Sequence, residues 1–415
     1  MAQPARLEKL ELERMVHGGF ALARLPGGRV ALVRGGLPGE RVEAELRAKS
    51  GVLQGQVTAV LAAATQRVPA SAHPGLDYSH ISYAGQLAIK REVVRDALSR
   101  ALKREVEVSA VVPAPREWAY RHAVQPAVSA TGLGYRQAGS HDVQTLASDP
   151  VAHEAINAIW RLWPDLAATK GVREIAFRCN AAGEVLLCLI AAASPKNYLG
   201  LAHELVRRGV AGVSHAPYDA RGRFRGGFER LAGARAIMDR YGRFELMVTA
   251  TSFAQPNPAA ASLLYRELED WVGTGSSALD LYAGSGIIAL HLAEHFERVT
   301  ALEVDRSSVA RGRRDAERLG IPNLEFVRAD AKRAGRLPEA ELITVDPPRA
   351  GLAKEVRAAI TDADARQLLY VSCDVATWAR DVADLETRGW QLRRFQPYDF
   401  YPQTHHIEML SLLAR

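Results

Sequence analysis

The sequence predicts an α/β protein in which a Rossmann-like domain follows a small β-barrel and a central α+β region. From about Ser252 onward, apolar segments of strand length alternate with segments of helical periodicity, a pattern typical of a doubly wound sheet. Between about Leu7 and Leu61, short alternating segments are separated by Gly-Gly and Pro-Gly turns, which favours a barrel of short strands. We therefore expect three parts, at residues 1–62, 63–250 and 251–415.

The composition narrows the class of protein. The chain has 415 residues, 48% of them hydrophobic, and a net charge of +6 that suits an anionic partner such as nucleic acid. No stretch approaches the roughly 18 apolar residues of a membrane span, and the first residues lack the apolar core of a secretion signal. Three cysteines are too few for a disulfide scaffold. We expect a cytoplasmic protein with no membrane partner.

The segments before residue 250 suggest contacts with nucleic acid. The barrel segments ALARLPG, GRVALVRG, ERVEAEL and LQGQVTAVL precede a linker rich in Ala, Ser and Pro, and then a predicted helix that ends near Leu102. Small barrels often bind oligonucleotides, although a structural barrel is the alternative. Further on, an arginine-rich segment either grips a nucleic-acid backbone or forms a solvated loop; its arginines are Arg221, Arg223, Arg225, Arg230 and Arg235.

Three acidic residues follow successive predicted strands of the C-terminal part. Asp280 precedes Gly284 and Gly286, and these glycines allow a ligand to approach the backbone closely. The glycine spacing also fits a dinucleotide, but Asp280 would repel a pyrophosphate and attract the ammonium group of S-adenosylmethionine. Glu303 can accept from ribose hydroxyls, and Asp330 from an adenine amine. One such acid alone could be a helix cap or a surface residue, but three together favour a nucleoside pocket.

Two further segments carry candidate chemistry. In LITVDPPRAGL, two prolines stiffen the turn after an apolar strand and leave Asp346 facing the pocket. Amino-directed nucleic-acid methylases have an aromatic residue where this chain has Arg349, which favours an anionic or carbonyl-bearing partner here. In VSCDVATWARD, Cys373 follows a predicted buried strand. It is either a packed thiol or a nucleophile, and the segment alone does not decide between them.

The order of DLYAGSG, DPPRAGL, VSCDVATWARD and PYDFYPQTHHIEML resembles the TRAM-containing RNA uridine-5-methyltransferases, the RumA/TrmA-like family. The resemblance covers nearly the whole chain, because EWAYRHAVQ, GYRQAGSHDV and SFAQPN also resemble family segments and the barrel resembles a TRAM domain, which is OB-like. It implies a class I methyltransferase domain that uses S-adenosylmethionine, a central RNA-binding domain, and a helix over residues 84–102 that packs with the catalytic domain.

The resemblance also implies roles for individual residues. Cys373 would add to uracil C6, C5 would attack the methyl group, and Glu408 would remove the C5 proton. The thiol should ionise near neutral pH, helped by the sulfonium of the donor and by Arg349. The implied cofactor-binding residues are Gln255, Asp280, Tyr282, Gly284, Gly286, Glu303, Asp330 and Asp346. The implied substrate-binding residues are Phe253, Asp346, Arg349, Gln403, Thr404, His406, Arg223 and Arg225. Plain structural roles remain the alternative for Phe253 and His406.

The chain departs from many members of this family at one point. Those relatives hold an iron–sulfur cluster with three cysteines in the linker and one before a proline in the central domain. The linker here has no cysteine, and Ser148 stands at the fourth position. We therefore expect no iron–sulfur cluster and no metal site. Cys179 and Cys188 lie in predicted strands and are expected in the core.

These observations lead to one principal hypothesis and three alternatives. The hypothesis is methylation of uridine C5 in RNA, with 23S ribosomal RNA favoured as the substrate and a monomer as the active form. Unstacking of the target nucleotide is expected, because C5 is not accessible inside a helix. The alternatives are the same reaction on transfer RNA, a non-catalytic RNA-binding protein that retains the fold, and a nicotinamide-dependent enzyme, which Asp280 disfavours.

Overall fold

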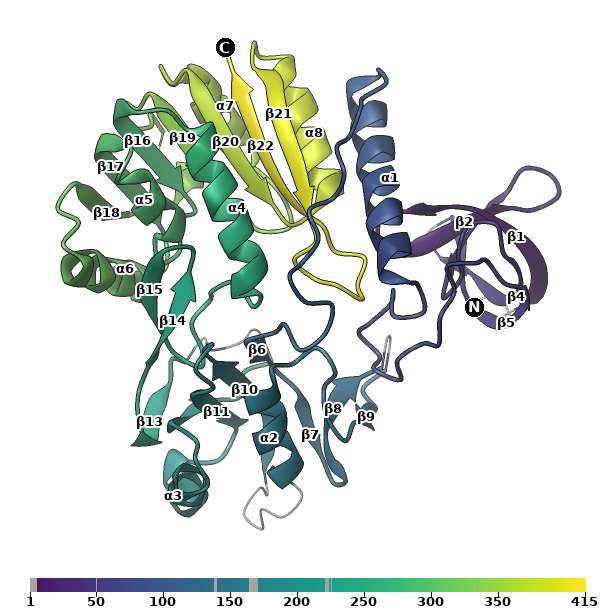
Figure 1. Cartoon of the computed structure of the whole chain (residues 1–415), viewed down its shortest axis with the longest axis horizontal. Helices are drawn as coiled ribbons and strands as arrows, with labels where there is room; N and C mark the ends of the chain where they lie inside the picture. The colour runs from purple at the N-terminus through teal and green to yellow at the C-terminus, as the bar shows by residue number, and fades with distance from the viewer. Residues whose placement is uncertain are drawn as a thin grey trace.

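The computed structural model describes residues 6–49, 51–137, 140–163, 171–220, 224, 226–333 and 335–415. Figure 1 shows an N-terminal barrel, a central region built on a sheet, and a C-terminal α/β domain. The predicted α/β class with an N-terminal barrel is therefore confirmed. Within the described ranges, no helix is long and apolar enough to cross a membrane. Arg221, Arg223 and Arg225, which were predicted to contact nucleic acid, lie outside the described residues.

Five strands close the barrel in the order β1-β2-β3-β5-β4. They are β1 (Arg6–Val16), β2 (Phe20–Arg24), β3 (Val30–Arg34), β4 (Arg41–Lys49) and β5 (Val52–Ala62). Residues alternate between the barrel interior and solvent, as the buried Val42, Ala44 and Leu46 of β4 show. Gly55 lets β5 approach β4 closely, since a Cβ there would lie 2.1 Å from the carbonyl oxygen of Glu45. Each barrel strand is paired on both sides, so the closed barrel has no free edge.

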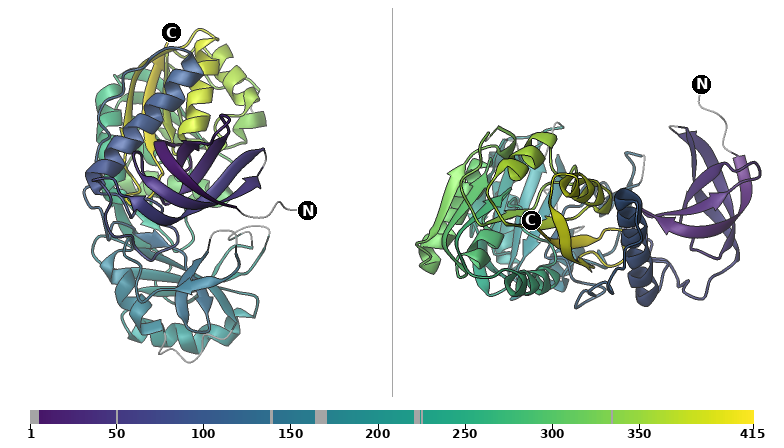
Figure 2. Two further views of the ribbon diagram at one scale, coloured as in Figure 1. Left: turned by 90° about the vertical axis from the view of Figure 1, so that its right-hand side faces the viewer. Right: turned by 90° about the horizontal axis from the view of Figure 1, so that it is seen from above.

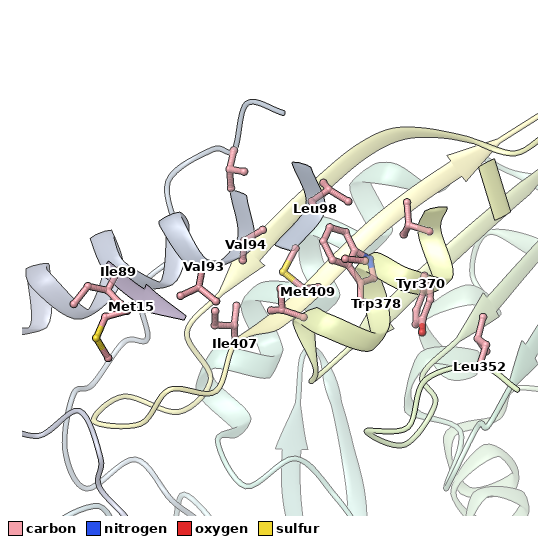
Figure 3. Packing of buried hydrophobic residues seen from close by; sticks show 14 of the residues in the cluster. Met15, Ile89, Val93, Val94, Leu98, Leu352, Tyr370, Trp378, Ile407 and Met409 are labelled. Atoms are coloured by element: carbon pink, nitrogen blue, oxygen red, sulfur yellow. The ribbon is translucent and has the colours of Figure 1, made fainter. Parts of the chain in front are cut away.

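A long helix, α1 (Tyr83–Leu102), stands between the barrel and the α/β domain (Figures 1 and 2). The hydroxyl of Ser82 caps its start by accepting a hydrogen bond from the backbone of Gly85. The apolar face of α1 packs in one continuous cluster with residues of the barrel and of the α/β domain (Figure 3). Members of this cluster are Met15, Ile89, Val93, Val94, Leu98, Trp378, Ile407 and Met409. The barrel and the α/β domain therefore share a core through α1.

A buried ion pair joins α1 to the C-terminal segment. Lys90 Nζ donates to Asp399 Oδ1 at 2.7 Å and to the carbonyl oxygen of Tyr401 at 3.3 Å, and both charged side chains are fully buried. Burial lowers the pKa of Lys90, and the carboxylate of Asp399 opposes this shift. One turn earlier, Gln86 donates to Gln403 Oε1 at 2.9 Å and accepts from the Gln403 backbone at 2.8 Å. These contacts fix the segment 399–407 against α1.

Polar contacts tie the linker before α1 to the central region. The fully buried Asp149 accepts a hydrogen bond of 2.6 Å from the Tyr135 hydroxyl, and its carboxylate lies 3.8 Å from His73 Nε2. The backbone of Asp149 donates to Asn157 of α2 (Glu154–Leu162) at 2.9 Å. This network borders Ser148, where the family resemblance places the fourth cluster cysteine of other members.

The central region is a sheet with helices on one face. Its strand order is β13-β12-β11-β10-β7-β8-β9, and β6 pairs with β10. Helices α2 and α3 (Leu199–Arg207) pack with this sheet around one core, and a short 3-10 helix, η2 (Pro195–Tyr198), precedes α3. The strands are β6 (Ala123–Val124), β7 (Ala127–Ser129), β8 (Gly132–Arg136), β9 (Val143–Thr145), β10 (Val172–Cys179), β11 (Val185–Ala191), β12 (Gly212–Pro217) and β13 (Glu229–Gly233). Cys179 and Cys188 are buried in β10 and β11, and burial raises the pKa of each thiol to about 12.

The α/β domain has seven strands in the order β18-β17-β16-β19-β20-β22-β21. The strands from β18 to β20 in this order are parallel, and β22 and β21 are antiparallel to their neighbours. They are β16 (Gly275–Leu281), β17 (Phe296–Glu303), β18 (Leu324–Arg328), β19 (Leu342–Val345), β20 (Gln367–Ser372), β21 (Gln391–Tyr398) and β22 (Glu408–Ala414).

Helices cover both faces of this sheet (Figure 1). One face carries α4 (Pro258–Trp271), α5 (Ile287–Leu292) and α6 (Arg306–Leu319), and the other carries α7 (Lys354–Asp362) and α8 (Val375–Glu386). A short 3-10 helix, η3 (Ala331–Arg333), follows β18. The hairpin of β14 (Ile237–Tyr241) and β15 (Phe244–Val248) packs on α4 and α6. The part of the chain that packs with the α/β domain therefore begins with β14, before the predicted start of this domain at residue 251.

Replacing Lys90 with methionine should lower the free energy of unfolding by about 3–5 kcal/mol, because Asp399 would stay buried without its cation. Urea unfolding followed by circular dichroism measures the change. The control Lys354→Met removes an exposed lysine and should change stability by less than about 0.5 kcal/mol. A double variant, Lys90→Met/Asp399→Asn, removes both charges and should recover part of the loss. Equal losses in the single and double variants would contradict this account.

Candidate active site

The principal site residues gather along one edge of the seven-stranded sheet. Parallel strands end at this edge and the antiparallel β22 begins there. Along the neighbouring strands β17, β16, β19, β20 and β22, the residues at this edge are, in order, Glu303, Asp280, Asp346, Cys373 and Glu408. Ligands of doubly wound sheets bind at this edge. The topology therefore joins the predicted nucleoside pocket to the predicted nucleophile and base.

The strand register sets Cys373 beside Glu408. β20 and β22 are antiparallel, and Ser372 pairs with Met409. Cys373 is the next residue after Ser372, and Glu408 is the residue before Met409. Continuing the register by one residue therefore brings Cys373 opposite Glu408. Because β20 ends at Ser372, Cys373 leaves the sheet and enters the turn before α8.

A tight turn follows β16 and leads into α5. Three of its residues adopt left-handed backbone conformations, with φ of 61° at Tyr282, 57° at Gly284 and 83° at Gly286. At Gly286 a Cβ would lie 2.4 Å from the ring of Phe326, so only glycine fits there. The Gly284 N–H donates to a carboxylate oxygen of Glu303 at 2.9 Å. This bond fixes the turn against the end of the neighbouring strand.

Asp280 supplies a buried carboxylate that lacks a complete set of partners. The Thr344 hydroxyl donates to its Oδ1 at 2.6 Å, whereas its Oδ2 has no hydrogen-bond partner within the described part of the chain. Burial raises the pKa of Asp280 to about 7, the Thr344 hydrogen bond opposes this shift, and the nearby charge of Asp346 adds to it. A cation bound at this carboxylate would compensate both the missing partner and the buried charge.

The other pocket residues are more exposed. Glu303 accepts from the backbone of Gly284 and, at 2.7 Å, from the backbone of Asp305. Asp330 is half-buried and accepts from the Lys332 backbone at 3.0 Å. The Tyr282 hydroxyl is buried and unpartnered among the described residues, and burial raises its pKa to about 12. The structure brings these residues to the same edge as Asp280.

The surroundings of Cys373 favour a neutral thiol. The residue is half-buried, and burial together with the charges of Glu408 and Asp346 raises its pKa to about 12, against the smaller opposing effect of Arg349. Three acidic side chains (Glu408, Asp346 and Asp374) and one arginine act on the thiol, which leaves a deficit of positive charge in the free protein. The expectation that the thiol ionises near neutral pH includes the charge of the bound donor, so it stays a prediction.

Glu408 is buried as deeply as any carboxylate of the site. It is 1% exposed, and neither of its carboxyl oxygens has a hydrogen-bond partner in the described structure. Burial raises the pKa of Glu408 well above its usual value, and the neighbouring charge of Asp346 raises it further. Burial likewise raises the pKa of Asp346 to about 7. Burial of both carboxyl groups therefore favours their neutral forms in the free protein.

The loop after Asp346 is held by the first turns of α8. The Thr377 hydroxyl donates to the backbone oxygen of Arg349 at 3.0 Å, and the buried Asp381 accepts from the backbone of Leu352 at 2.7 Å. The Arg349 guanidinium lies 3.3 Å from His406 Nε2. Burial and the charges of His405 and Arg349 lower the pKa of His406 to about 3, so a neutral imidazole faces the guanidinium.

Gln403 and Thr404 are engaged within the protein. The side-chain oxygen of Gln403 accepts from Gln86, and its backbone has φ of 69°. The Thr404 hydroxyl donates to the carbonyl oxygen of Tyr401 at 2.8 Å and accepts from the His406 backbone at 3.3 Å. These bonds shape the segment that leads into Glu408, and the role of Gln403 and Thr404 in substrate binding stays a prediction.

Phe253 and Gln255 lie on the loop before α4. Phe253 is 74% exposed, which excludes the alternative that it is a plain core residue. Gln255 is buried, and its side-chain oxygen accepts from the Tyr401 hydroxyl at 3.5 Å. Asn257 caps α4 and donates to the backbone oxygen of Phe400 at 2.9 Å. The loop is therefore fixed to the segment before Glu408 while its phenyl ring faces solvent.

Two residues near the site were missed by sequence reasoning. Arg121, in the segment EWAYRHAVQ, lies with its guanidinium carbon 5.5 Å from the Tyr401 ring centre, and its buried Nε has no partner in the described chain. The only sequence signal was an arginine inside a family-like segment. His17 of the barrel lies 3.2 Å from a carboxylate oxygen of Asp374, the residue after Cys373. No local signal predicts this contact, because it depends on how the barrel docks.

Among the described residues, no cluster of three or more His, Cys, Asp or Glu side chains has an arrangement that could hold a metal ion. The Cys373 side chain is therefore placed beside acidic residues rather than in a set of metal ligands.

Replacing Asp280 with asparagine should stabilise the free protein by about 1–3 kcal/mol more at about pH 8 than at about pH 5. The folded-state pKa of about 7 lies above the unfolded value, so the native carboxyl loses stability as the pH rises through that range. Asparagine keeps the acceptor for Thr344 without the charge. Urea unfolding at both pH values measures the difference, with the exposed Asp364→Asn as the control. A gain that is equal at both pH values would contradict the assignment.

Comparisons with known proteins agree with this architecture. A model of the tRNA (uracil-5-)-methyltransferase family matches residues 232–415. An uncharacterized RNA methyltransferase of Thermosynechococcus vestitus is 32% identical over 99% of this chain and 98% of its own length. One of Gloeobacter violaceus is 30% identical over 96% of this chain and 94% of its own.

A solved structure shares the fold over almost the whole length. It is the tRNA (uracil-54, C5)-methyltransferase of Pyrococcus abyssi in complex with S-adenosyl-L-homocysteine. The two have a TM-score of 0.79 and 21% sequence identity, and the match covers 98% of this chain and 100% of the other. The likeness includes the barrel, the central region and the α/β domain, so it extends beyond the matched family segment. The full-length relatives show that the chain belongs to a family of RNA methyltransferases, and its residues 232–415 match the tRNA (uracil-5-)-methyltransferase family model.

Proposed function

We propose that this protein transfers a methyl group from S-adenosylmethionine to C5 of a uridine in RNA through a covalent adduct with Cys373. The observation that carries the proposal is the position of Cys373 beside the buried Glu408, on the sheet edge that also bears Asp280 and its glycine turn. A nucleophile, a proton acceptor and a cation-binding carboxylate are the groups that this reaction requires.

The carboxyl edge of the sheet offers groups that suit S-adenosylmethionine. The unpartnered oxygen of Asp280 suits its ammonium group, and Glu303 and Asp330 suit its ribose and adenine. Gly284 and Gly286 let the backbone approach the ligand, with Tyr282 and Gln255 nearby. The bound donor supplies the methyl group and a positive sulfonium charge. The Pyrococcus abyssi structure, which contains S-adenosyl-L-homocysteine, supports a site of this kind.

The target uridine would enter beside Phe253. The exposed phenyl ring offers a stacking surface for an unstacked base. Asp346 and Arg349 can bond to the uracil edge, and His406, with its neutral imidazole, orients Arg349. Arg121 has a free Nε–H close to Tyr401 and can bond to a uracil oxygen or a phosphate. Burial of the base would complete the hydrogen-bonding of these groups.

The bonding changes follow from the roles of Cys373 and Glu408. Cys373 Sγ bonds to C6 of uracil, and the resulting enolate makes C5 nucleophilic. C5 then bonds to the methyl group, whose bond to the donor sulfur breaks. Glu408 accepts the C5 proton, and the Sγ–C6 bond breaks to regenerate the thiolate.

Ionisation of Cys373 has to accompany binding, since its pKa is about 12 in the free protein. The positive charge of the bound donor favours the thiolate of Cys373 and the carboxylate of Glu408 together. We therefore infer that the nucleophile becomes reactive only when donor and RNA are in place. This protects the thiol from other electrophiles, because the thiol form reacts slowly.

Two classes of RNA are candidate substrates. The TRAM-like barrel favours 23S ribosomal RNA, which we propose as the substrate, and the active form as a monomer in the cytoplasm. Transfer RNA is the second candidate, favoured by the substrate named for the Pyrococcus abyssi protein. Arg230 and Arg235 remain proposed backbone contacts, as do Arg223 and Arg225.

RNA with 5-fluorouridine at the target position should form a stable covalent adduct, because fluorine at C5 is not removed as a proton is. The adduct should appear as a slower band in denaturing gels and require S-adenosylmethionine for the methylated form. Cys373→Ser should abolish it. Glu408→Gln should accumulate a similar adduct even with ordinary uridine, since the C5 proton stays in place. An undiminished adduct in Cys373→Ser would overturn the mechanism.

Expression in a bacterium lacking its own uridine-5-methyltransferases should introduce 5-methyluridine into 23S ribosomal RNA and leave transfer RNA unmodified. Nuclease digestion followed by mass spectrometry of the separated RNAs locates the modified nucleotide. The same host carrying Cys373→Ala serves as the control and should show no 5-methyluridine. Modification of transfer RNA alone would assign the second candidate, and 5-methyluridine in neither RNA would overturn the proposed activity.

A further inference from the structure

One turn of the barrel contacts the segments of both proposed catalytic residues. This β1–β2 turn comprises His17, Gly18 and Gly19, between β1 and β2. It touches the start of α8, directly after Cys373, and the segment that precedes Glu408. Figure 2 shows that the barrel lies to one side of the molecule, with α1 between it and the sheet. Through this turn the barrel contacts the segments next to Cys373 and Glu408, although α1 separates the rest of the barrel from the sheet.

The first contact is with the residue after Cys373. His17 Nε2 lies 3.2 Å from Asp374 Oδ2, while Asp374 Oδ1 caps α8 by accepting from the Thr377 backbone at 2.9 Å. The Thr377 hydroxyl in turn donates to the backbone of Arg349 at 3.0 Å. The hydrogen bonds from His17 and Thr377 hold the pKa of Asp374 well below its usual range. An ionised Asp374 thus links the barrel to the turn that carries Cys373.

The second contact is with the segment before Glu408. His405 Nδ1 lies 2.6 Å from Asp77 Oδ2, and the His405 backbone donates to Asp77 Oδ1 at 3.1 Å. Arg34 of β3 donates to the same carboxylate at 3.2 Å. Gly19 closes over this pair, because a Cβ there would lie 2.4 Å from Asp77 Oδ2 and 3.2 Å from His405. The turn thereby rests directly on the segment that leads to Glu408.

We propose that the β1–β2 turn positions the nucleophile and base segments relative to each other, with His17 as a positioning residue. The proposal rests on the proposed function of Cys373 and Glu408. Cys373 lies in the loop before α8, and Glu408 begins β22 directly after the segment 399–407. A single rigid turn bound to this loop and this segment limits their relative motion. Displacement of reacting groups by about 1 Å can cost about 100-fold in rate.

A role in RNA capture alone does not account for these contacts. A barrel that only binds RNA needs only a linker to the rest of the protein. His17 and Gly19 instead contact protein groups beside the segments of the proposed catalytic residues. Loss of a positioning contact lowers the rate of the covalent step, while loss of an RNA contact weakens binding. The two roles therefore differ in which measured constant changes.

The test compares five variants. Three quantities are measured: the rate of adduct formation with 5-fluorouridine RNA, the Kd for unmodified RNA, and hydrogen exchange of the segments 373–378 and 403–408. His17→Ala should slow adduct formation about tenfold with Kd changed less than about twofold, and His17→Gln, which keeps an N–H donor, should recover most of the rate. Gly19→Ala should also slow it. Gly18→Ala is the matched control, because φ is 87° at Gly18 and 78° at Gly19 but only Gly19 faces Asp77.

Three results would overturn the proposal: weakened RNA binding with an unchanged adduct rate, equal effects of Gly18→Ala and Gly19→Ala, and unchanged exchange in both segments. Faster exchange in both segments of His17→Ala and Gly19→Ala supports it. A further outcome is that the unsubstituted protein forms no adduct while hydrogen exchange of the two segments is still faster in these variants. That result would contradict the proposed reaction but support the positioning role of the turn. The exposed Arg29→Ala, elsewhere on the barrel, controls for general effects of barrel substitution.

Discussion

The buried ion pair between Lys90 and Asp399 is the interaction on which the C-terminal half of the site depends. An ammonium and a carboxylate removed from water are tolerated only when they satisfy each other. Lys90 also bonds to the backbone of Tyr401, and Gln86 bonds to Gln403, so α1 holds the segment 399–407 at several points. Glu408 follows this segment directly. The strand register sets Glu408 beside Cys373, and a helix more than 300 residues earlier in the chain holds the segment that leads to it.

Strand topology accounts for the other half of the site. The residues that could be predicted from the sequence, Asp280, Glu303, Asp346 and Cys373, each follow a run of apolar residues, and a doubly wound sheet aligns the ends of such runs. The glycine turn was equally visible, because Gly284 and Gly286 require left-handed conformations. Local pattern and one topological rule are sufficient for these positions. Their roles in the reaction remain predictions.

The remaining features depend on contacts between distant segments, which local patterns do not contain. The pairing of Gln403 with Gln86 and the approach of His17 to Asp374 require the docking of α1 and of the barrel. The raised pKa of the Cys373 thiol also depends on packing, because it follows from burial and from acids that separate segments bring near. The packing of the hairpin β14–β15 has the same origin: the hairpin lies before residue 251, yet it packs on α4 and α6 and not in the central sheet. The sequence therefore identifies the acidic and thiol groups of the site, whereas their pKa shifts depend on burial and on neighbours from other segments.

The shared core along α1 has a consequence for synthesis on the ribosome. The helix and the barrel are complete early, but the apolar face of α1 packs on Trp378, Ile407 and Met409, which are translated last. That face stays uncovered until almost the whole chain has emerged, although N-terminal domains generally fold first. A nascent chain with an exposed amphipathic helix is a substrate for chaperones. Truncation near the C-terminus would therefore leave this face of α1 without the partners that cover it in the complete fold.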